Sequence, residues 1–143
     1  MQIKIASQKQ VRKSGSVKNY YSVSLCLDIA QNSVEVLETI RSVFGGTIFA
    51  NKSKNPNSAT GHMLRMYKNT AEVFLKAIQP YSIVKRNHVQ LGLDYIDLKN
   101  SDDSSLYVLS CKGSRQRSPL LLEKELEFAA KSKELNRRGL ALQ

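Results

Sequence analysis

The chain has 143 residues, of which 41% are hydrophobic, and its 22 lysine and arginine residues exceed its 12 aspartate and glutamate residues, giving a formal net charge of +10. This length suits one domain with a hydrophobic core, and the composition excludes a disordered tail. No segment approaches the roughly 18 apolar residues of a membrane span, and the N-terminus lacks a signal pattern. We therefore expect an intracellular protein that acts in the cytoplasm.

The positive charge is concentrated near the N-terminus, where every charged residue before Asp28 is a lysine or an arginine. A basic protein attracts a polyanion, and nucleic acid is the usual one. The charge alone also fits a basic protein without such a partner. An anionic membrane is disfavoured, because the basic residues fall in strands and turns and not on an amphipathic helix.

The cysteines and histidines do not indicate a metal site. Cys26 and Cys111 lie far apart in the sequence, and the two histidines stand at no ligand spacing from them. We therefore expect no disulfide, no bound metal and no cofactor.

The first half of the chain predicts strands followed by a helix. Residues 2–6 and 19–29 alternate between apolar and polar side chains, as half-buried strands do, and the basic segment 9–18 between them predicts a hairpin tip. The predicted inner face of the second strand contains Tyr21, Val23, Leu25, Leu27 and Ile29. Asn32 and Glu35 then fit a capping box, and the helix that follows should end at Gly45-Gly46. Its predicted inner side contains Val36, Leu37, Ile40, Val43 and Phe44.

The second half repeats this pattern and adds helices. We expect strands over 47–51 and 62–67, a loop over 52–61, a helix opened by Asn69 and Glu72 and ended by Pro80, and a further helix over 84–98. A polar break spans 99–105, the type of 106–111 stays open, and 112–118 reads as a basic loop. A last helix should run from Ser118-Pro119 to Arg138-Gly139. The predicted buried positions of these helices are Ala71, Phe74, Leu75, Ile78, Val89, Leu93, Ile96, Leu121, Leu122 and Leu126.

This order predicts an α+β fold with a four-stranded antiparallel sheet (ββαββα), helices on one face and a C-terminal helix. We expect one domain over 1–143, with a core over 2–98 and a helical extension over 99–143. If helices cover one side of the sheet, its open side carries polar side chains that can hydrogen-bond base edges, since an antiparallel ribbon fits the major groove. The predicted base-reading residues are Lys4, Tyr20, Ser22, Ser24, Thr47, Phe49, Asn51, Arg65 and Tyr67.

Basic residues at the two hairpins lie where they can neutralise DNA phosphates. An ordinary solvated sheet face is the alternative for the polar side chains. Binding of a single strand by the exposed aromatic rings is a second alternative, although the clustered aromatic and glycine pattern of RNA-binding sheets is absent. The predicted phosphate contacts are Lys9, Arg12, Lys13, Lys18, Lys52, Lys54 and Lys85.

Three segments resemble the LAGLIDADG homing endonucleases: FLKAIQPYSIVKRNHVQLGLDYI (74–96), SVEVLETIRSVFGG (33–46) and SPLLLEKELEFAAKSKELN (118–136). The resemblance covers about residues 2–138. It implies a saddle-shaped antiparallel sheet that straddles duplex DNA and reads long sites through the same open face. It also aligns Lys85 with the family's basic residue near the scissile phosphates, and Asp28 with a polar position of the active-site pocket.

The sequence departs from the family at its start. In the family, an acidic helix that holds divalent metals precedes the first strand. Here the chain opens directly on the strand QIKI, and the acid in LCLDIAQN belongs to the second strand by its alternation. We therefore expect no catalytic residue and no enzyme.

These observations predict a sequence-specific double-stranded DNA-binding protein without nuclease activity, used as a transcriptional repressor in a phage or mobile element and located in a bacterial or phage-infected cell. The partner is duplex DNA, with no small-molecule substrate, and both a monomer and a homodimer stay open. Three further functions also stay open: an active nuclease, a phage-type inhibitor that binds a protein, and an RNA-binding protein.

Overall fold

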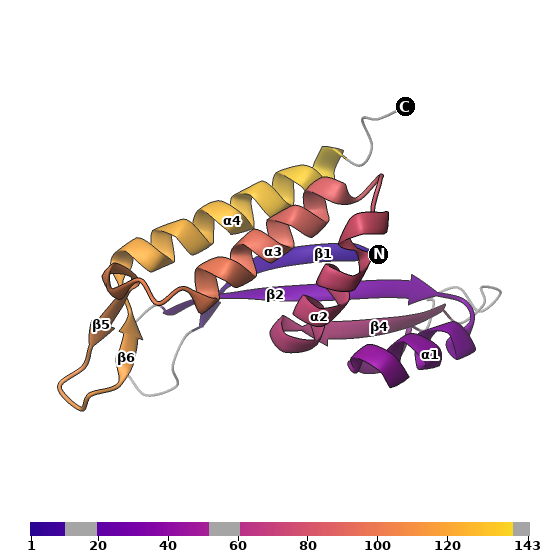
Figure 1. Cartoon of the computed structure of the whole chain (residues 1–143), viewed down its shortest axis with the longest axis horizontal. Helices are drawn as coiled ribbons and strands as arrows, with labels where there is room; N and C mark the ends of the chain where they lie inside the picture. Colours follow the sequence, from indigo (N-terminus) through magenta and orange to yellow (C-terminus); the bar gives the residue numbers. More distant parts are fainter. Residues whose placement is uncertain (11–19, 52–60, 139–143) are drawn as a thin grey trace.

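A computed structural model of the chain describes residues 1–10, 20–51 and 61–138. Four strands form an antiparallel sheet in the order β1-β2-β4-β3, with β2 and β4 in the centre (Figure 1). The α+β class and the ββαββα order predicted from the sequence are confirmed. The strands are β1 (Gln2–Gln10), β2 (Tyr20–Gln31), β3 (Thr47–Asn51) and β4 (Gly61–Tyr67).

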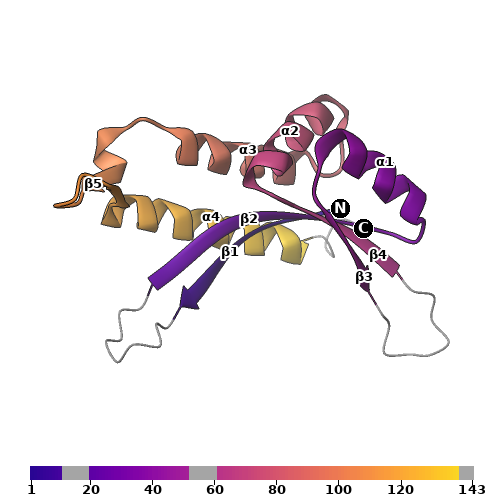
Figure 2. The ribbon, with the colours of Figure 1, turned by 90° about the horizontal axis from the view of Figure 1, so that it is seen from below.

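Helices α1, α2 and α3 lie on one side of this sheet, and α4 runs along its β1 edge (Figure 2). In the edge-on view, the sheet arches like a saddle, and the described ends of both strand pairs point away from α1, α2 and α3 (Figure 2). One face of the saddle is therefore left open along its length. The helices are α1 (Val34–Phe44), α2 (Lys68–Ile78), α3 (Arg86–Asn100) and α4 (Pro119–Arg138), with short 3₁₀ turns at Gln79–Tyr81 and Ser104–Leu106.

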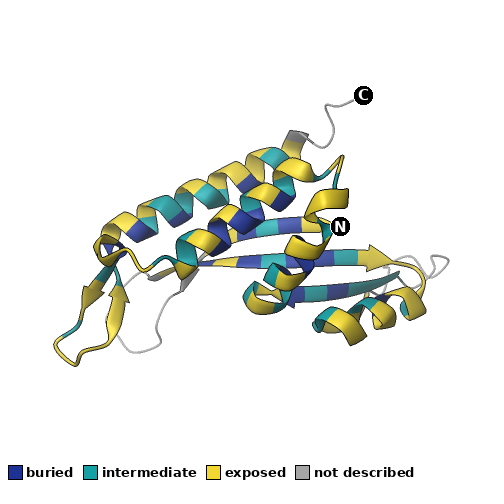
Figure 3. Ribbon diagram, viewed as in Figure 1, coloured by how far each residue is buried: buried dark blue, intermediate teal, exposed yellow. Residues whose placement is uncertain are grey.

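The core forms between the sheet and the helices because the strands alternate. In β2, Leu25 and Leu27 are buried, and Leu64 and Met66 of β4 are buried beside them, while Cys26 and Arg65 between them are partly exposed. Figure 3 shows how burial changes from residue to residue along these strands. Burying a leucine contributes roughly 1.5 to 3 kcal/mol. The burial predicted for Tyr21 is wrong, since 40% of this residue is exposed near the start of β2.

The predicted capping boxes of α1 and α2 are wrong. The N-cap residues are Ser33 and Tyr67, and neither side chain caps its helix. Asn69 instead lies inside α2, because the helix begins directly from β4. Its predicted partner Glu72 forms an ion pair with Lys76, with 2.7 Å between Nζ and Oε1. The tight strand-to-helix junction thus leaves no room for the expected cap.

The inner side of α1 is narrower than its sequence pattern predicts. Leu37 is its buried residue, whereas Val36 and Val43 are exposed, the latter to 68%. The helix lies at the end of the sheet beside β3 and β4 (Figure 1), so that only one stripe of its surface meets the sheet. For a helix at the periphery of the sheet, the apolar pattern of the sequence therefore predicts more buried residues than the structure contains.

The segment between α3 and α4 contains a small hairpin. Strand β5 (Tyr107–Leu109) pairs antiparallel with β6 (Arg115–Arg117), which lies in the segment predicted as a basic loop. The glycine at the turn, Gly113, has a positive φ of 75°. The start of α4 agrees with the prediction, because Ser118 Oγ accepts a hydrogen bond from the amide of Leu121 at 3.2 Å.

Helix α4 covers the outer edge of β1. The amide of Ile5 donates to Ser132 Oγ at 3.0 Å, and Asn136 Nδ2 donates to the carbonyl of Ile3 at 3.1 Å. Edge strands present unpaired backbone groups to which other chains can add. These two side chains occupy that edge and fasten the C-terminal helix to the first strand.

The turn between α1 and β3 requires a glycine at position 46. Its φ is 107°, and a Cβ there would lie 2.8 Å from the carbonyl oxygen of Arg65. We expect Gly46→Ala to lower the free energy of unfolding by about 2 kcal/mol, because backbone strain adds to a clash with backbone. Gly61→Ala is the control, since no atom of the described residues lies within 4 Å of its Cβ position. Equal effects in chemical denaturation would contradict the expectation.

Candidate nucleic-acid interface

The open face of the sheet consists of side chains from all four strands in matching register. One row across the sheet contains Gln2, Asp28, Arg65 and Thr47. The next row contains Lys4, Cys26 and Tyr67, and a third contains Ala30, Met63 and Phe49. The register of these rows places five of the predicted base-reading residues on one face, namely Lys4, Thr47, Phe49, Arg65 and Tyr67, while their contact with bases stays a prediction.

The predicted base-reading residues differ in how far they are exposed. Ser24, Thr47, Phe49 and Tyr67 are exposed, and Lys4, Ser22 and Arg65 are partly exposed. Tyr20 and Asn51 lie at strand ends, and their side chains fall outside the described part. The described face therefore offers hydroxyl, ammonium and guanidinium groups beside two aromatic rings.

An ion pair between β2 and β4 lies in the first of these rows. Arg65 Nε donates to Asp28 Oδ1 at 2.7 Å, and Arg65 Nη2 donates to Asp28 Oδ2 at 3.1 Å. Asp28 is only 5% exposed. The guanidinium also lies over the ring of Phe49, with 5.7 Å between Cζ and the ring centroid. Arg65 is therefore held in one orientation on the open face.

Two neighbours complete the surroundings of this carboxylate. Lys4 Nζ lies 3.7 Å from Asp28 Oδ2, and Cys26 Sγ donates to Asp28 Oδ1 at 3.5 Å. Burial alone would raise the pKa of Asp28, but the hydrogen bonds and positive charge of Arg65 outweigh it and hold that pKa below its ordinary value. Asp28 is thus ionised at neutral pH and lies between two cations.

The ion pair between Asp28 and Arg65 was not predicted from the sequence, although the sequence contained part of the information needed. Alternation assigned Asp28 and Arg65 to the same face, but the register that places them opposite each other depends on how β2 and β4 are aligned. Opposite charges on adjacent strands of one face are a favourable cross-strand pair.

The predicted phosphate contacts are mostly untested by the structure. Lys9 belongs to β1, but its side chain is outside the described part, as are Arg12, Lys13, Lys18, Lys52 and Lys54 in full. Lys85 is the N-cap residue of α3. It therefore lies in the helical layer and not on a strand of the open face.

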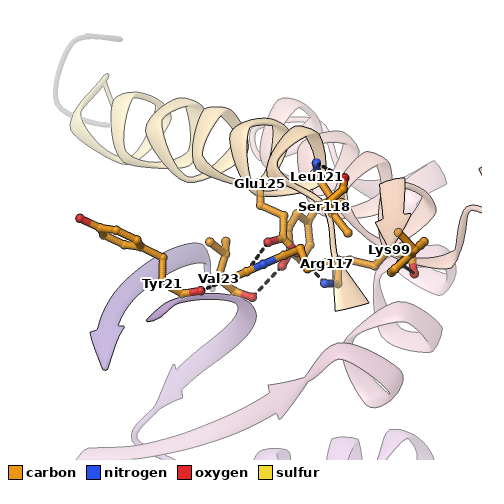
Figure 4. A network of polar contacts seen from close by, with 9 residues as sticks. Tyr21, Val23, Lys99, Arg117, Ser118, Leu121 and Glu125 are labelled. Atoms are coloured by element: carbon orange, nitrogen blue, oxygen red, sulfur yellow. Dashed lines mark hydrogen bonds and ion pairs between the residues drawn. The ribbon is translucent and has the colours of Figure 1, made fainter. Parts of the chain in front are cut away.

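A buried ion cluster joins the C-terminal segment to β2 (Figure 4). Glu125 of α4 is 0% exposed and receives Lys99 Nζ at 2.5 Å and Arg117 Nη1 at 2.6 Å. Arg117 also donates to the backbone carbonyl of Tyr21. No sequence pattern indicated this cluster, because Glu125 looks like a solvated glutamate on an amphipathic helix.

A tyrosine of α3 reinforces this junction. Tyr95 Oη donates to the carbonyl of Val23 at 2.9 Å, and burial, followed by the charge of Glu125, raises the pKa of Tyr95. The two bonds to carbonyls of β2, from Arg117 and Tyr95, fix the strand close to its N-terminal end.

Within the described ranges, no three His, Cys, Asp or Glu side chains come together in a group that could hold a metal ion. The same ranges contain no helix whose length and apolar content would let it cross a bilayer.

Only the comparison with solved structures, and not the comparison of sequences, finds proteins that are similar to this chain. No family model matches the sequence, and no curated protein matches it. Among solved structures, the homing endonuclease I-CvuI in complex with its target superimposes with a TM-score of 0.58 at 19% identity, covering 93% of this chain and 73% of that one. The archaeal intron-encoded homing endonuclease I-Vdi141I, complexed with DNA, gives 0.58 at 16% identity, covering 93% of this chain and 76% of that one.

A third structure matches nearly end to end. The homing endonuclease I-TnaI gives a TM-score of 0.57 at 16% identity and covers 99% of this chain and 90% of that one. The expectation that the chain is not an enzyme is contradicted, because these structural neighbours are all homing endonucleases, which are enzymes. That expectation rested on where the sequence begins, which is not a property of the described fold. The open saddle, its element order and these superpositions agree that the chain has the fold of the LAGLIDADG homing endonucleases.

Proposed function

We propose that the chain binds double-stranded DNA in a sequence-specific manner through the open face of its sheet. The observation that carries this proposal is the pair of in-register rows with polar side chains on the open face, one with Gln2, Asp28, Arg65 and Thr47 and one with Lys4, Cys26 and Tyr67. An antiparallel ribbon is narrow enough to enter the major groove, where each base pair presents a distinct set of donors and acceptors. Two of the matched proteins support the proposal, since they are described in complex with a target or with DNA.

The chemistry of the face suits this role. Hydroxyl groups of Ser24 and Thr47 can both donate and accept hydrogen bonds, while Lys4 and Arg65 donate to guanine acceptors. The net charge of +10 attracts the duplex before specific contacts form. Phosphate contacts then orient the protein, and base contacts select the site.

Selection of bound sites from a random duplex library tests the proposal. We expect one enriched motif, and we expect Arg65→Ala to change its sequence. Lys76→Ala is the control, because Lys76 belongs to α2 in the helical layer and pairs with Glu72. Absence of duplex binding at low salt would contradict the proposal. Preference for a matched RNA would indicate an RNA-binding protein, and stoichiometric capture of a protein without any duplex preference would indicate a protein-binding inhibitor.

Cleavage of the bound DNA is a second candidate function. Its supporting observation is that the superimposed structures are homing endonucleases. The described residues contain no set of three candidate metal ligands, so no hydrolytic step is assigned to them. Nicking of a plasmid that carries the selected site, in Mg²⁺ or Mn²⁺, would establish it. Asp28→Ala then asks whether Asp28 takes part.

We further propose transcriptional repression, in a phage or another mobile element, as the biological use of the binding. A protein that occupies a promoter excludes RNA polymerase from it. A reporter gene with the selected motif inside its promoter should lose expression when the chain is produced. A reporter with a scrambled motif should keep its expression, and equal repression of both would contradict this use.

A further inference from the structure

We propose that Asp28 is a positioning residue that fixes Arg65 for bidentate recognition of a guanine in the major groove. The inference rests on the proposed function, because it requires the open face to contact base edges. It adds the base that is read, the residue that reads it, and the residue that orients the reader.

The geometry of the ion pair leaves the outer edge of the guanidinium available. A guanidinium has five N–H donors in one plane. The bonds at 2.7 Å and 3.1 Å use one hydrogen on Nε and one on Nη2. The remaining hydrogens are on Nη1 and Nη2, directed away from Asp28. Two such parallel donors match O6 and N7 of guanine, the commonest specific contact in the major groove.

The surroundings of Arg65 restrict the guanidinium further. The ring of Phe49 lies beside it, with 5.7 Å between Cζ and the ring centroid. A flexible arginine can turn toward phosphates or toward several bases. One that is held by a carboxylate and a ring presents its donors in a single direction, and this is what discrimination between bases requires.

Asp28 itself is not placed to read a base. A carboxylate could accept from the amino group of cytosine. However, Asp28 is 5% exposed, and both of its oxygens already have partners in Arg65, with Lys4 at 3.7 Å and Cys26 at 3.5 Å. Its effect on DNA therefore passes through Arg65.

The local charge is compatible with DNA beside this row. Asp28 faces two cations, Lys4 and Arg65, so the three side chains together retain one positive charge. A buried acid next to a phosphate backbone would otherwise repel it. The alternative role for Asp28 is structural, as a link between β2 and β4 without influence on the choice of base.

Site selection and measured dissociation constants separate these roles, with the wild type, Arg65→Lys, Asp28→Asn and the control Lys76→Gln. We expect the wild type to prefer guanine over other bases about 10- to 100-fold at one position of the motif. Arg65→Lys keeps the charge but lacks the two-pronged edge, so the preference at that position should disappear. Asp28→Asn should weaken the preference at the same position about tenfold, and Lys76→Gln should change nothing.

Several results would overturn the inference. If Arg65→Lys alters a position that is not guanine, or if Asp28→Asn leaves the guanine preference intact, Asp28 does not position a guanine reader. Uniformly tighter binding of all duplexes by Asp28→Asn would show that the carboxylate acts only through its charge. Circular dichroism and thermal unfolding establish that each variant is folded. If Asp28→Asn does not fold, Asp28→Glu replaces it, because this variant keeps the charge but displaces the carboxylate that holds Arg65. An unchanged guanine preference in Asp28→Glu would then overturn the inference.

The failure of this inference is distinguishable from the failure of the proposed function. A wild type that binds no duplex refutes both. A wild type that selects a motif in which Arg65→Lys changes no guanine refutes only the positioning role of Asp28.

Discussion

Replacing Glu125 with alanine should lower the free energy of unfolding by about 3 kcal/mol, at the low end of the range for removing one partner of a buried ion pair. Glu125 is fully buried, and its loss leaves Lys99 and Arg117 facing each other without a counter-charge. The expected loss of free energy of unfolding lies at the low end of this range because Lys99 and Arg117 are both about a quarter exposed, so that water still reaches their charges. Urea denaturation followed by circular dichroism measures it.

A conservative variant and a control make this result specific. Glu125→Gln retains the shape but places an amide donor against two cations, so we expect most of the same loss. Glu127→Ala, at an exposed position of the same helix, should change stability by less than about 0.5 kcal/mol. A loss below about 1 kcal/mol in Glu125→Ala would mean that the cluster of Figure 4 does not support the fold.

Raising the salt concentration from about 50 to 200 mM should weaken duplex binding about 10³- to 10⁴-fold. Six lysine and arginine side chains of the two hairpins are predicted to contact phosphates, with Lys85 left aside because it lies in the helical layer, and each releases condensed counterions when it does so. The logarithm of the affinity should therefore fall with the logarithm of the salt concentration at a slope of about −5. Fluorescence anisotropy of a labelled duplex, titrated at several salt concentrations, gives this slope.

Single substitutions then test where the phosphate contacts lie. Arg12→Ala or Lys13→Ala should weaken all duplexes alike and make the slope shallower by about 1. Lys76→Ala removes the same charge from the helical layer and should leave the slope unchanged. A slope near −2, or an equal effect of all three variants, would show that attraction by net charge replaces defined contacts at the hairpins.

The sheet could be predicted from the sequence because alternation is a local property. The period of two in residues 19–29 determines which side chains share a face, and the observed pairing agrees with it. Register is different, since it depends on how two distant strands are aligned. The pairing of Asp28 with Arg65 followed only once β2 and β4 were placed side by side.

The helices show where local patterns mislead. Asn69 and Glu72 have the spacing of a capping box, yet the direct passage from β4 into α2 places Asn69 inside the helix. Glu125 occupies a position of α4 that reads as solvated, and it is buried only because Lys99 and Arg117 approach from other elements. Such long-range neutralisation of a charge leaves no trace in spacing or composition.

The bond between Ile5 and Ser132 joins residues separated by 127 positions. On the ribosome, the first strand is synthesised well before the helix that covers its outer edge. The growing chain must therefore hold a sheet with an uncovered edge until α4 has been made, and such edges promote aggregation. Truncation of the chain before Ser132 should therefore cause it to accumulate as insoluble protein.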